Sequence, residues 1–179
     1  MNRDFTTSPF DNIDVRPSAK GGLGVFALKP FNAGDFIRER LIVQEITPEN
    51  PLPPDVNPDH AYQADGKWLL VGEPDCYLNH SCDPNAWLRY VEDRIELVAR
   101  RRIEPGDEIT LDYLINNAGG DSWLCNCGAA RCRGETCSGF FALPLEFQRE
   151  YYPLLADWFK RCYSEALERL QKRMEEAGE

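Results

Sequence analysis

The sequence predicts a mainly β domain with short helices that ends in an α-helical segment. Short apolar stretches bounded by turn residues recur through most of the 179-residue chain. The clearest pair, 86–91 and 94–99, alternates in polarity and is joined by Glu92-Asp93, as in a β-hairpin. From residue 143 onward, apolar residues recur instead at helical spacing. The length suits one domain with an appended segment.

The strands expected before the hairpin are short. They are predicted at 13–16, at 25–28, within 36–46 as one strand or two, at 62–64 and at 68–71. Glycines in 20–24 indicate a turn after the first strand, because glycine adopts backbone angles that other residues avoid. Five prolines in 47–59 predict a surface loop, since proline cannot donate a backbone hydrogen bond.

Residues 143–177 predict an amphipathic C-terminal α-helix, with Pro153 suited to a first helical turn. The apolar residues at helical spacing are Leu155, Trp158, Phe159, Cys162, Ala166, Leu167, Leu170 and Met174. Such a face ordinarily packs on the rest of its own domain, although a protruding end could serve dimerisation. A monomer and a homodimer through this helix therefore both remain open.

Thirty acidic and twenty basic side chains give a net charge of −10. This argues against strong nucleic-acid binding, which needs a dense basic surface, and suits a basic protein partner. No stretch approaches the roughly 20 apolar residues that cross a bilayer. Because residues 1–5 also lack the apolar run of a signal peptide, we expect a cytoplasmic protein. Seven cysteines in that compartment indicate metal binding rather than disulfides.

Four segments carry the recognisable motifs. The glycine segment (22–27) reads Gly-Leu-Gly-Val-Phe-Ala, and the histidine segment (79–85) reads Asn-His-Ser-Cys-Asp-Pro-Asn. The tyrosine segment (106–113) reads Gly-Asp-Glu-Ile-Thr-Leu-Asp-Tyr, and the cysteine segment (125–134) holds Cys-x-Cys-x4-Cys. Together they resemble the SET-domain protein-lysine methyltransferases that carry a zinc-binding post-SET segment, especially small free-standing bacterial members.

The resemblance covers roughly residues 13–141 and implies a SET β-fold with pseudoknot-like threading. The expected divisions are an N-terminal tail (1–12), a SET domain (13–115), a post-SET zinc segment (120–141) and a C-terminal helical segment (143–177). By the same resemblance, the histidine and tyrosine segments meet across the active site.

Methyl transfer mainly requires that two reactants be aligned and water excluded, so positioning groups matter more than nucleophiles. The resemblance implies Tyr113 and Tyr62 as catalytic residues, with Leu111 and Tyr77 in the substrate channel. It implies S-adenosylmethionine as cofactor, bound by Gly22, Leu23, Gly24, Tyr62, Asn79, His80, Tyr113 and Phe141. Phe140 could replace Phe141, and both could equally be anchors for the C-terminal helix.

The cysteine segment supplies three thiolates, Cys125, Cys127 and Cys132, whereas structural zinc normally takes four ligands. The resemblance implies that Cys82 is the fourth, which would bind one zinc ion per chain. Four unrelated buried cysteines are the alternative, and Cys137 could act as a substitute ligand.

The function expected by resemblance is S-adenosylmethionine-dependent methylation of a lysine in a basic segment of a protein substrate. The alternative is a catalytically inactive SET module that serves as a zinc-containing peptide-binding or interaction domain. Two positions depart from the family pattern. Cys76 stands where many members carry a basic residue, and Leu111 replaces an aromatic residue two positions before the catalytic tyrosine.

Overall fold

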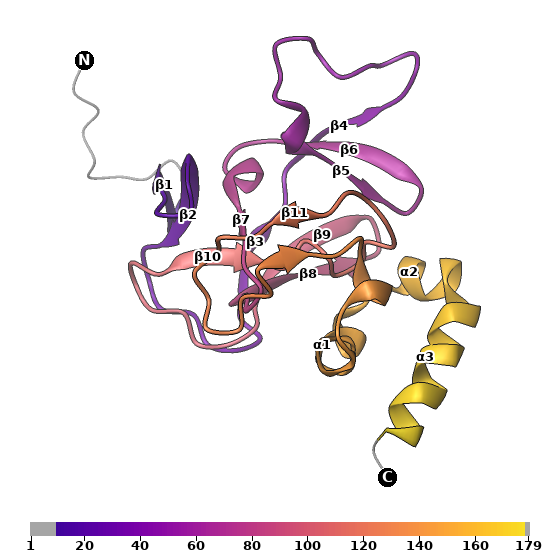
Figure 1. The fold of residues 1–179 in the computed structure, drawn as a ribbon. Helices are drawn as coiled ribbons and strands as arrows, with labels where there is room; N and C mark the ends of the chain where they lie inside the picture. Colours follow the sequence, from indigo (N-terminus) through magenta and orange to yellow (C-terminus); the bar gives the residue numbers. More distant parts are fainter. Residues whose placement is uncertain (1–9, 178–179) are drawn as a thin grey trace, which may run out of the picture.

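The computed structural model describes residues 10–177, so most of the expected N-terminal tail (1–12), including residues 1–5, lies outside the described residues. These residues contain four small β-sheets (Figure 1). The first contains, in spatial order, β1 (Ile13–Pro17), β2 (Leu23–Ala27), β10 (Glu108–Leu111) and β7 (Asn79–His80). The second contains β3 (Phe36–Glu39), β9 (Arg94–Ala99) and β8 (Ala86–Val91). The third contains β4 (Ile42–Ile46), β6 (Lys67–Val71) and β5 (Ala61–Ala64), and β11 (Trp123–Leu124) pairs with β12 (Glu135–Thr136).

The first sheet brings three of the motif segments together. Strand β10 of the tyrosine segment pairs antiparallel with β2 of the glycine segment and parallel with β7 of the histidine segment. Asn85 extends this pairing, because its side chain accepts from the N–H of Thr110 and donates to the carbonyl of Glu108. The tyrosine segment is thus held between two segments that are distant in sequence, as the threading of a SET fold requires.

The strands predicted from local pattern are confirmed. Region 36–46 forms two strands, β3 and β4, and β8 pairs with β9 over their full length. Glu92 in the connecting turn has a φ of 53°, which suits the tight hairpin expected there. The proline-rich region 47–59 contains no strand, and only the start of the 3-10 turn η1 (Pro58–His60) falls within it.

Beneath the sheets lies a core of buried apolar side chains. Its members are Ile13, Val25, Ala27, Phe31, Ile37, Leu78, Ala86, Leu97, Ala99, Ile103, Ile109 and Leu111. Strands β2, β9 and β10 each place alternate residues in this core, because successive side chains of a strand point to opposite faces. Glu108 and Thr110 lie on the opposite face of β10, where they make polar contacts with Asn79 and Asn85.

The predicted C-terminal α-helix is present as α3 (Ser164–Glu176), but the helical pattern from residue 143 is divided. Two shorter helices, α1 (Leu145–Tyr151) and α2 (Asp157–Cys162), precede it, with 3-10 turns η3 (Phe140–Ala142) and η4 (Tyr152–Leu154). Pro153 lies in the first turn of η4. Tyr163 adopts φ −120° and ψ 29°, outside the helical region, and so separates α2 from α3.

The apolar face of α3 is used within its own chain. Leu167 and Leu170 are buried in a second core together with Phe140, Phe147, Tyr151 and Phe159. Figure 1 shows the three α-helices on one side of the sheets, away from β1 and β2. Packing on the chain's own domain thus accounts for the amphipathic pattern. No helix within residues 10–177 combines the length and apolar character needed to cross a membrane.

Candidate active site and metal centre

The glycine segment and the histidine segment are joined by Asn79. Its side-chain amide donates to the carbonyl of Leu23 at 2.9 Å and to Oε1 of Glu108 at 2.8 Å. Gly22 has a φ of 61°, and nothing lies within 4 Å of the position where a Cβ would stand. Gly24 is the opposite case, because a Cβ there would lie 2.5 Å from Glu108 Oε1. Gly22 therefore leaves its backbone accessible, and Gly24 allows the Glu108 side chain to pack against the backbone.

Glu108 is the acceptor that organises this corner. Besides Asn79, Ser18 Oγ donates to it at 2.8 Å and Lys20 Nζ at 2.6 Å. Burial of Glu108 disfavours its charge, but these three hydrogen bonds outweigh burial and lower the pKa of its carboxyl. A charged Glu108 thus fixes the turn before β2 to the start of β10.

Tyr113 lies directly beyond β10, where its backbone and its hydroxyl are both held. Its hydroxyl donates to the carbonyl of Leu78 at 2.6 Å, and its N–H donates to Nδ1 of His80 at 3.3 Å. Burial of the hydroxyl raises the pKa of Tyr113 to about 12, although 45% of the whole side chain's surface remains exposed. Tyr113 therefore presents a neutral hydroxyl beside a main-chain carbonyl oxygen.

His80 connects Tyr113 to the cysteines. Because the Tyr113 N–H donates to Nδ1, a neutral His80 carries its hydrogen on Nε2, which lies 3.4 Å from Cys82 Sγ. Burial lowers the pKa of His80 to about 4, so the ring is neutral near pH 7. The assigned tautomer directs an N–H at the sulfur atom.

Trp123, which sequence reasoning missed, completes an aromatic group with His80 and Tyr113. The centre of its indole ring lies 5.8 Å from that of His80 and 6.4 Å from that of Tyr113. Trp123 belongs to β11 and pairs with Thr136 of β12, so the region around the cysteine segment brings it here. An aromatic residue two positions before the first cysteine was the only available signal.

The remaining predicted site residues are more dispersed. The Arg40 guanidinium stacks 4.3 Å over the ring of Tyr62, and burial raises the pKa of the Tyr62 hydroxyl. Tyr77 donates its hydroxyl to Glu73 at 2.7 Å, while Leu111 is buried in the core beneath the first sheet. A role for these three residues at the reacting centre remains a prediction.

Phe140 and Phe141 both lie in the C-terminal core. Phe140 is fully buried, and the ring of Phe141 stacks on that of Phe159 with centres 5.7 Å apart. Phe141 also meets the edge of Tyr163. These contacts match the alternative that the two residues anchor the helices, while a cofactor contact by Phe141 remains a prediction.

Cys82, Cys125, Cys127 and Cys132 converge as predicted, with all four sulfur atoms within 4.8 Å of one another. The Cys82 and Cys125 sulfurs are 3.7 Å apart, close to the roughly 3.8 Å expected for tetrahedral zinc with Zn–S bonds of about 2.3 Å. Burial opposes ionisation of Cys127, but N–H groups of Cys82 and Ala129 help lower its pKa to about 7. The donor set and its spacing fit a structural zinc ion.

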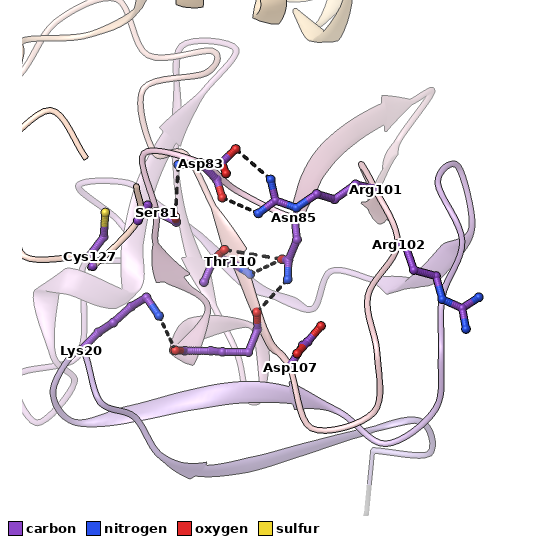
Figure 2. A pocket seen from close by; sticks show the side chains of 12 residues that line it. Lys20, Ser81, Asp83, Asn85, Arg101, Arg102, Asp107, Thr110 and Cys127 are labelled. Carbon is purple, nitrogen blue, oxygen red and sulfur yellow. Dashed lines mark hydrogen bonds and ion pairs between the residues drawn. The ribbon is translucent and has the colours of Figure 1, made fainter. Parts of the chain in front are cut away.

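A separate hollow of about 380 Å³ lies on the Glu108 and Thr110 side of β10 (Figure 2). Its charged side chains are already engaged, because Lys20 pairs with Glu108 and Arg101 pairs with Asp83. None of the predicted cofactor residues lines it. The hollow is therefore distinct from the group formed by Tyr113, His80 and Trp123.

Comparison with known proteins agrees with this geometry. The family model of the SET domain matches residues 22–114, which is more than half of the chain. The chain belongs to the SET-domain family. The cysteine cluster, which joins Cys82 of the matched region to three cysteines that follow that region, fits a post-SET zinc site.

Several curated histone-lysine methyltransferases are similar to this SET domain. Drosophila melanogaster Set2 is 48% identical over 62 residues, covering 32% of this chain and 3% of that protein. The H3 lysine-36 specific enzyme of Candida albicans is 42% identical over 149 residues, covering 74% and 17%. The solved structure of a Plasmodium falciparum "putative histone methyltransferase" has 28% identity and a TM-score of 0.49, covering 57% of this chain and 92% of its own.

The chain spans only part of its curated relatives, from 1% of human histone-lysine N-methyltransferase 2D to 41% of an Arabidopsis thaliana relative. The matched region contains Asn79, His80, Tyr113 and Cys82, and the other three cysteines of the cluster follow it. Cys76 and Leu111 remain the two departures noted from the sequence.

Proposed function

We propose that this SET domain is a protein-lysine N-methyltransferase that uses S-adenosylmethionine. The observation that carries the proposal is the placement of the Tyr113 hydroxyl against the Leu78 carbonyl, directly beside Asn79 and His80. The curated relatives, which are named histone-lysine methyltransferases, support the same reaction class. No feature of residues 10–177 favours the inactive module over the enzyme.

The residues present suit the cofactor. When bound, S-adenosylmethionine supplies an electrophilic methyl group. Polar contacts can come from the accessible backbone at Gly22 and from Asn79, whose amide is held by the Leu23 carbonyl. Tyr113 and Trp123 offer partly exposed aromatic surface. We assign the cofactor contacts to Gly22, Leu23, Gly24, Asn79, His80 and Tyr113, with Tyr62 and Phe141 as further candidates.

The contribution of Tyr113 is alignment. A neutral hydroxyl that donates to Leu78 keeps a lone pair free, and the Leu78 carbonyl provides a second oxygen beside it. Two oxygens at this position can accept weak C–H···O contacts and hold a lysine amine in line for attack. The carbonyl oxygen is fixed by the backbone, so little reorganisation is needed during the reaction.

The four cysteines would hold one zinc ion per chain. Cys82 belongs to the histidine segment of the SET domain, whereas the other three ligands follow the tyrosine segment. Closure of this cluster would fix the post-SET segment, including Trp123, beside Tyr113. Water exclusion and binding of the substrate would then depend on the metal.

The proposed substrate is a protein segment that is basic and contains the target lysine. The net charge of −10 favours such a partner over nucleic acid. Because relatives are named as histone methyltransferases, a histone tail is the first substrate class to test. A cytoplasmic location, the oligomeric state and the segment boundaries inferred from sequence remain predictions.

The test is transfer of tritiated methyl groups from S-adenosylmethionine to separated core histones and to basic proteins of a cell lysate. We expect label in the wild-type reaction and about 100-fold less with Tyr113→Phe at matched zinc content. Lysine-free peptide provides a control. If zinc-loaded protein binds S-adenosylmethionine but labels no protein fraction, the inactive module replaces the proposed function.

A further inference from the structure

Arg133 is the residue after the zinc ligand candidate Cys132, and its guanidinium forms a two-pronged ion pair with Asp112. Its two terminal nitrogens lie 2.7 and 3.1 Å from the two carboxylate oxygens. The pair is almost completely buried, with 8% of the Arg133 side chain and none of the Asp112 side chain exposed. Such bidentate geometry fixes orientation as well as distance.

The ion pair also restricts Tyr113, because Asp112 is the residue that precedes Tyr113 in the chain. Its Oδ1 also accepts from the N–H of Leu114 at 3.1 Å, so the carboxylate bridges the turn that contains Tyr113. On the other side, His80 accepts from the Tyr113 N–H. The backbone of Tyr113 is therefore held between the carboxylate and the imidazole.

Arg133 is also tied to the metal centre. Its backbone N–H donates to Cys82 Sγ at 3.4 Å, while its side chain reaches Asp112. One residue of the cysteine segment thus touches both a proposed zinc ligand and the carboxylate next to Tyr113. The closed cluster therefore helps to place the Arg133 backbone where its guanidinium reaches Asp112.

We propose that Arg133 is a positioning residue that aligns Tyr113 through Asp112. The inference rests on the proposed methyltransferase function for its kinetic consequence. The structural link itself is independent of that function. Arg133 touches neither reactant in this account.

Arg131 provides a matched control on the same segment. Its guanidinium lies 4.4 Å from the centre of the Phe147 ring, and that of Arg133 lies 5.1 Å from it. Arg131 also forms an ion pair, but its partner is Glu150 of α1 at 2.8 Å, away from the turn at Tyr113. The two arginines therefore share a segment and an aromatic neighbour but differ in their partner and in burial, since 41% of the Arg131 side chain is exposed against 8% for Arg133.

The experiment compares Arg133→Lys, Asp112→Asn, the double variant and Arg131→Lys, each checked for folding and for one zinc per chain. Lysine cannot reproduce the two-pronged contact. We expect Arg133→Lys and Asp112→Asn each to lower kcat by about 10- to 100-fold, with KM for a lysine peptide and Kd for S-adenosylmethionine changed less than about threefold. The double variant should lose no more than the worse single variant, since both changes break one link.

A spectroscopic readout separates this link from the reaction. In protein labelled with ¹³C-tyrosine, the Tyr113 signal is assigned by its absence in Tyr113→Phe. It should shift in Arg133→Lys and stay in place in Arg131→Lys. If the wild type shows no methyltransferase activity, the proposed function fails while this signal still tests the link.

An unshifted Tyr113 signal in folded Arg133→Lys would overturn the proposal. A wild-type value of kcat in that variant would also overturn it. Losses that multiply in the double variant would also contradict it, because independent effects would then operate. If Arg133→Lys fails to fold, kcat and the Tyr113 signal of Asp112→Asn test the proposal in its place.

Discussion

The hydroxyl of Tyr113 donates to the carbonyl of Leu78 at 2.6 Å, linking the second residue after β10 to the residue before β7. Replacing Tyr113 with phenylalanine keeps the ring and its contacts with His80 and Trp123 but removes the hydroxyl. We expect kcat to fall about 100-fold with little change in the Kd of S-adenosylmethionine, because alignment rather than ground-state binding is lost. Steady-state kinetics and calorimetry measure the two quantities.

Tyr163→Phe is the control for that experiment, because its ring packs on Phe159 in the C-terminal core. It should leave kcat unchanged. Wild-type turnover by Tyr113→Phe would remove the Tyr113 hydroxyl from the mechanism.

The pH dependence of the rate should report the substrate lysine rather than Tyr113. A free lysine amine has a pKa of about 10.4, so its reactive neutral fraction rises about tenfold per pH unit from pH 7 to 9. Burial raises the pKa of Tyr113 to about 12, which keeps its hydroxyl protonated throughout that range. Single-turnover rates should therefore rise with a slope near one. A rate that falls between pH 8 and 9 would indicate an ionising enzyme group and contradict this assignment.

Zinc content should depend on Cys82 as strongly as on the cysteine segment. We expect one zinc per folded wild-type chain, and large loss in both Cys82→Ser and Cys132→Ser, because each removes one of four converging sulfurs. Cys137→Ser should retain the metal, since the Cys137 sulfur instead lies 3.6 Å from the Gly139 carbonyl. Elemental analysis decides. Full zinc in Cys82→Ser together with loss in Cys132→Ser would show that the core does not supply the fourth ligand.

Gly24→Ala should destabilise the fold more than Gly119→Ala. A Cβ at Gly24 would stand 2.5 Å from Glu108 Oε1, an oxygen held by Ser18 and Asn79, whereas a Cβ at Gly119 would have no neighbour within 4 Å. Displacing Glu108 should cost about 1–3 kcal/mol, a typical range for overpacking. Thermal unfolding of the two variants gives the comparison. Equal melting temperatures would mean that Glu108 moves aside freely.

Local features of the fold were accessible from sequence because they depend on neighbouring residues. The β8–β9 hairpin was evident from alternation around Glu92, and the proline content of 47–59 excluded a strand. The end of α2 was not evident, since the backbone of Tyr163 leaves the helical region while its ring packs near Phe159 and Phe141. Periodicity alone does not contain that contact.

At the site, motif resemblance brought Cys82 to the other three cysteines although 43 positions separate it from Cys125. It did not reveal Trp123, Glu108 or the Arg133–Asp112 pair. Each of these depends on segments that meet only after folding, such as β11 beside Tyr113 or Lys20 beside β10. The sequence shows the residue types but not these contacts between distant segments.

Identifying the side chain that receives the methyl group tests the proposed lysine methyltransferase activity itself. A labelled substrate is hydrolysed completely and its amino acids are separated, using wild-type enzyme and Tyr113→Phe at equal zinc content. We expect the label in N-methylated lysine, and about 100-fold less of it with Tyr113→Phe. Label in another amino acid, or equal labelling by both proteins, would contradict it.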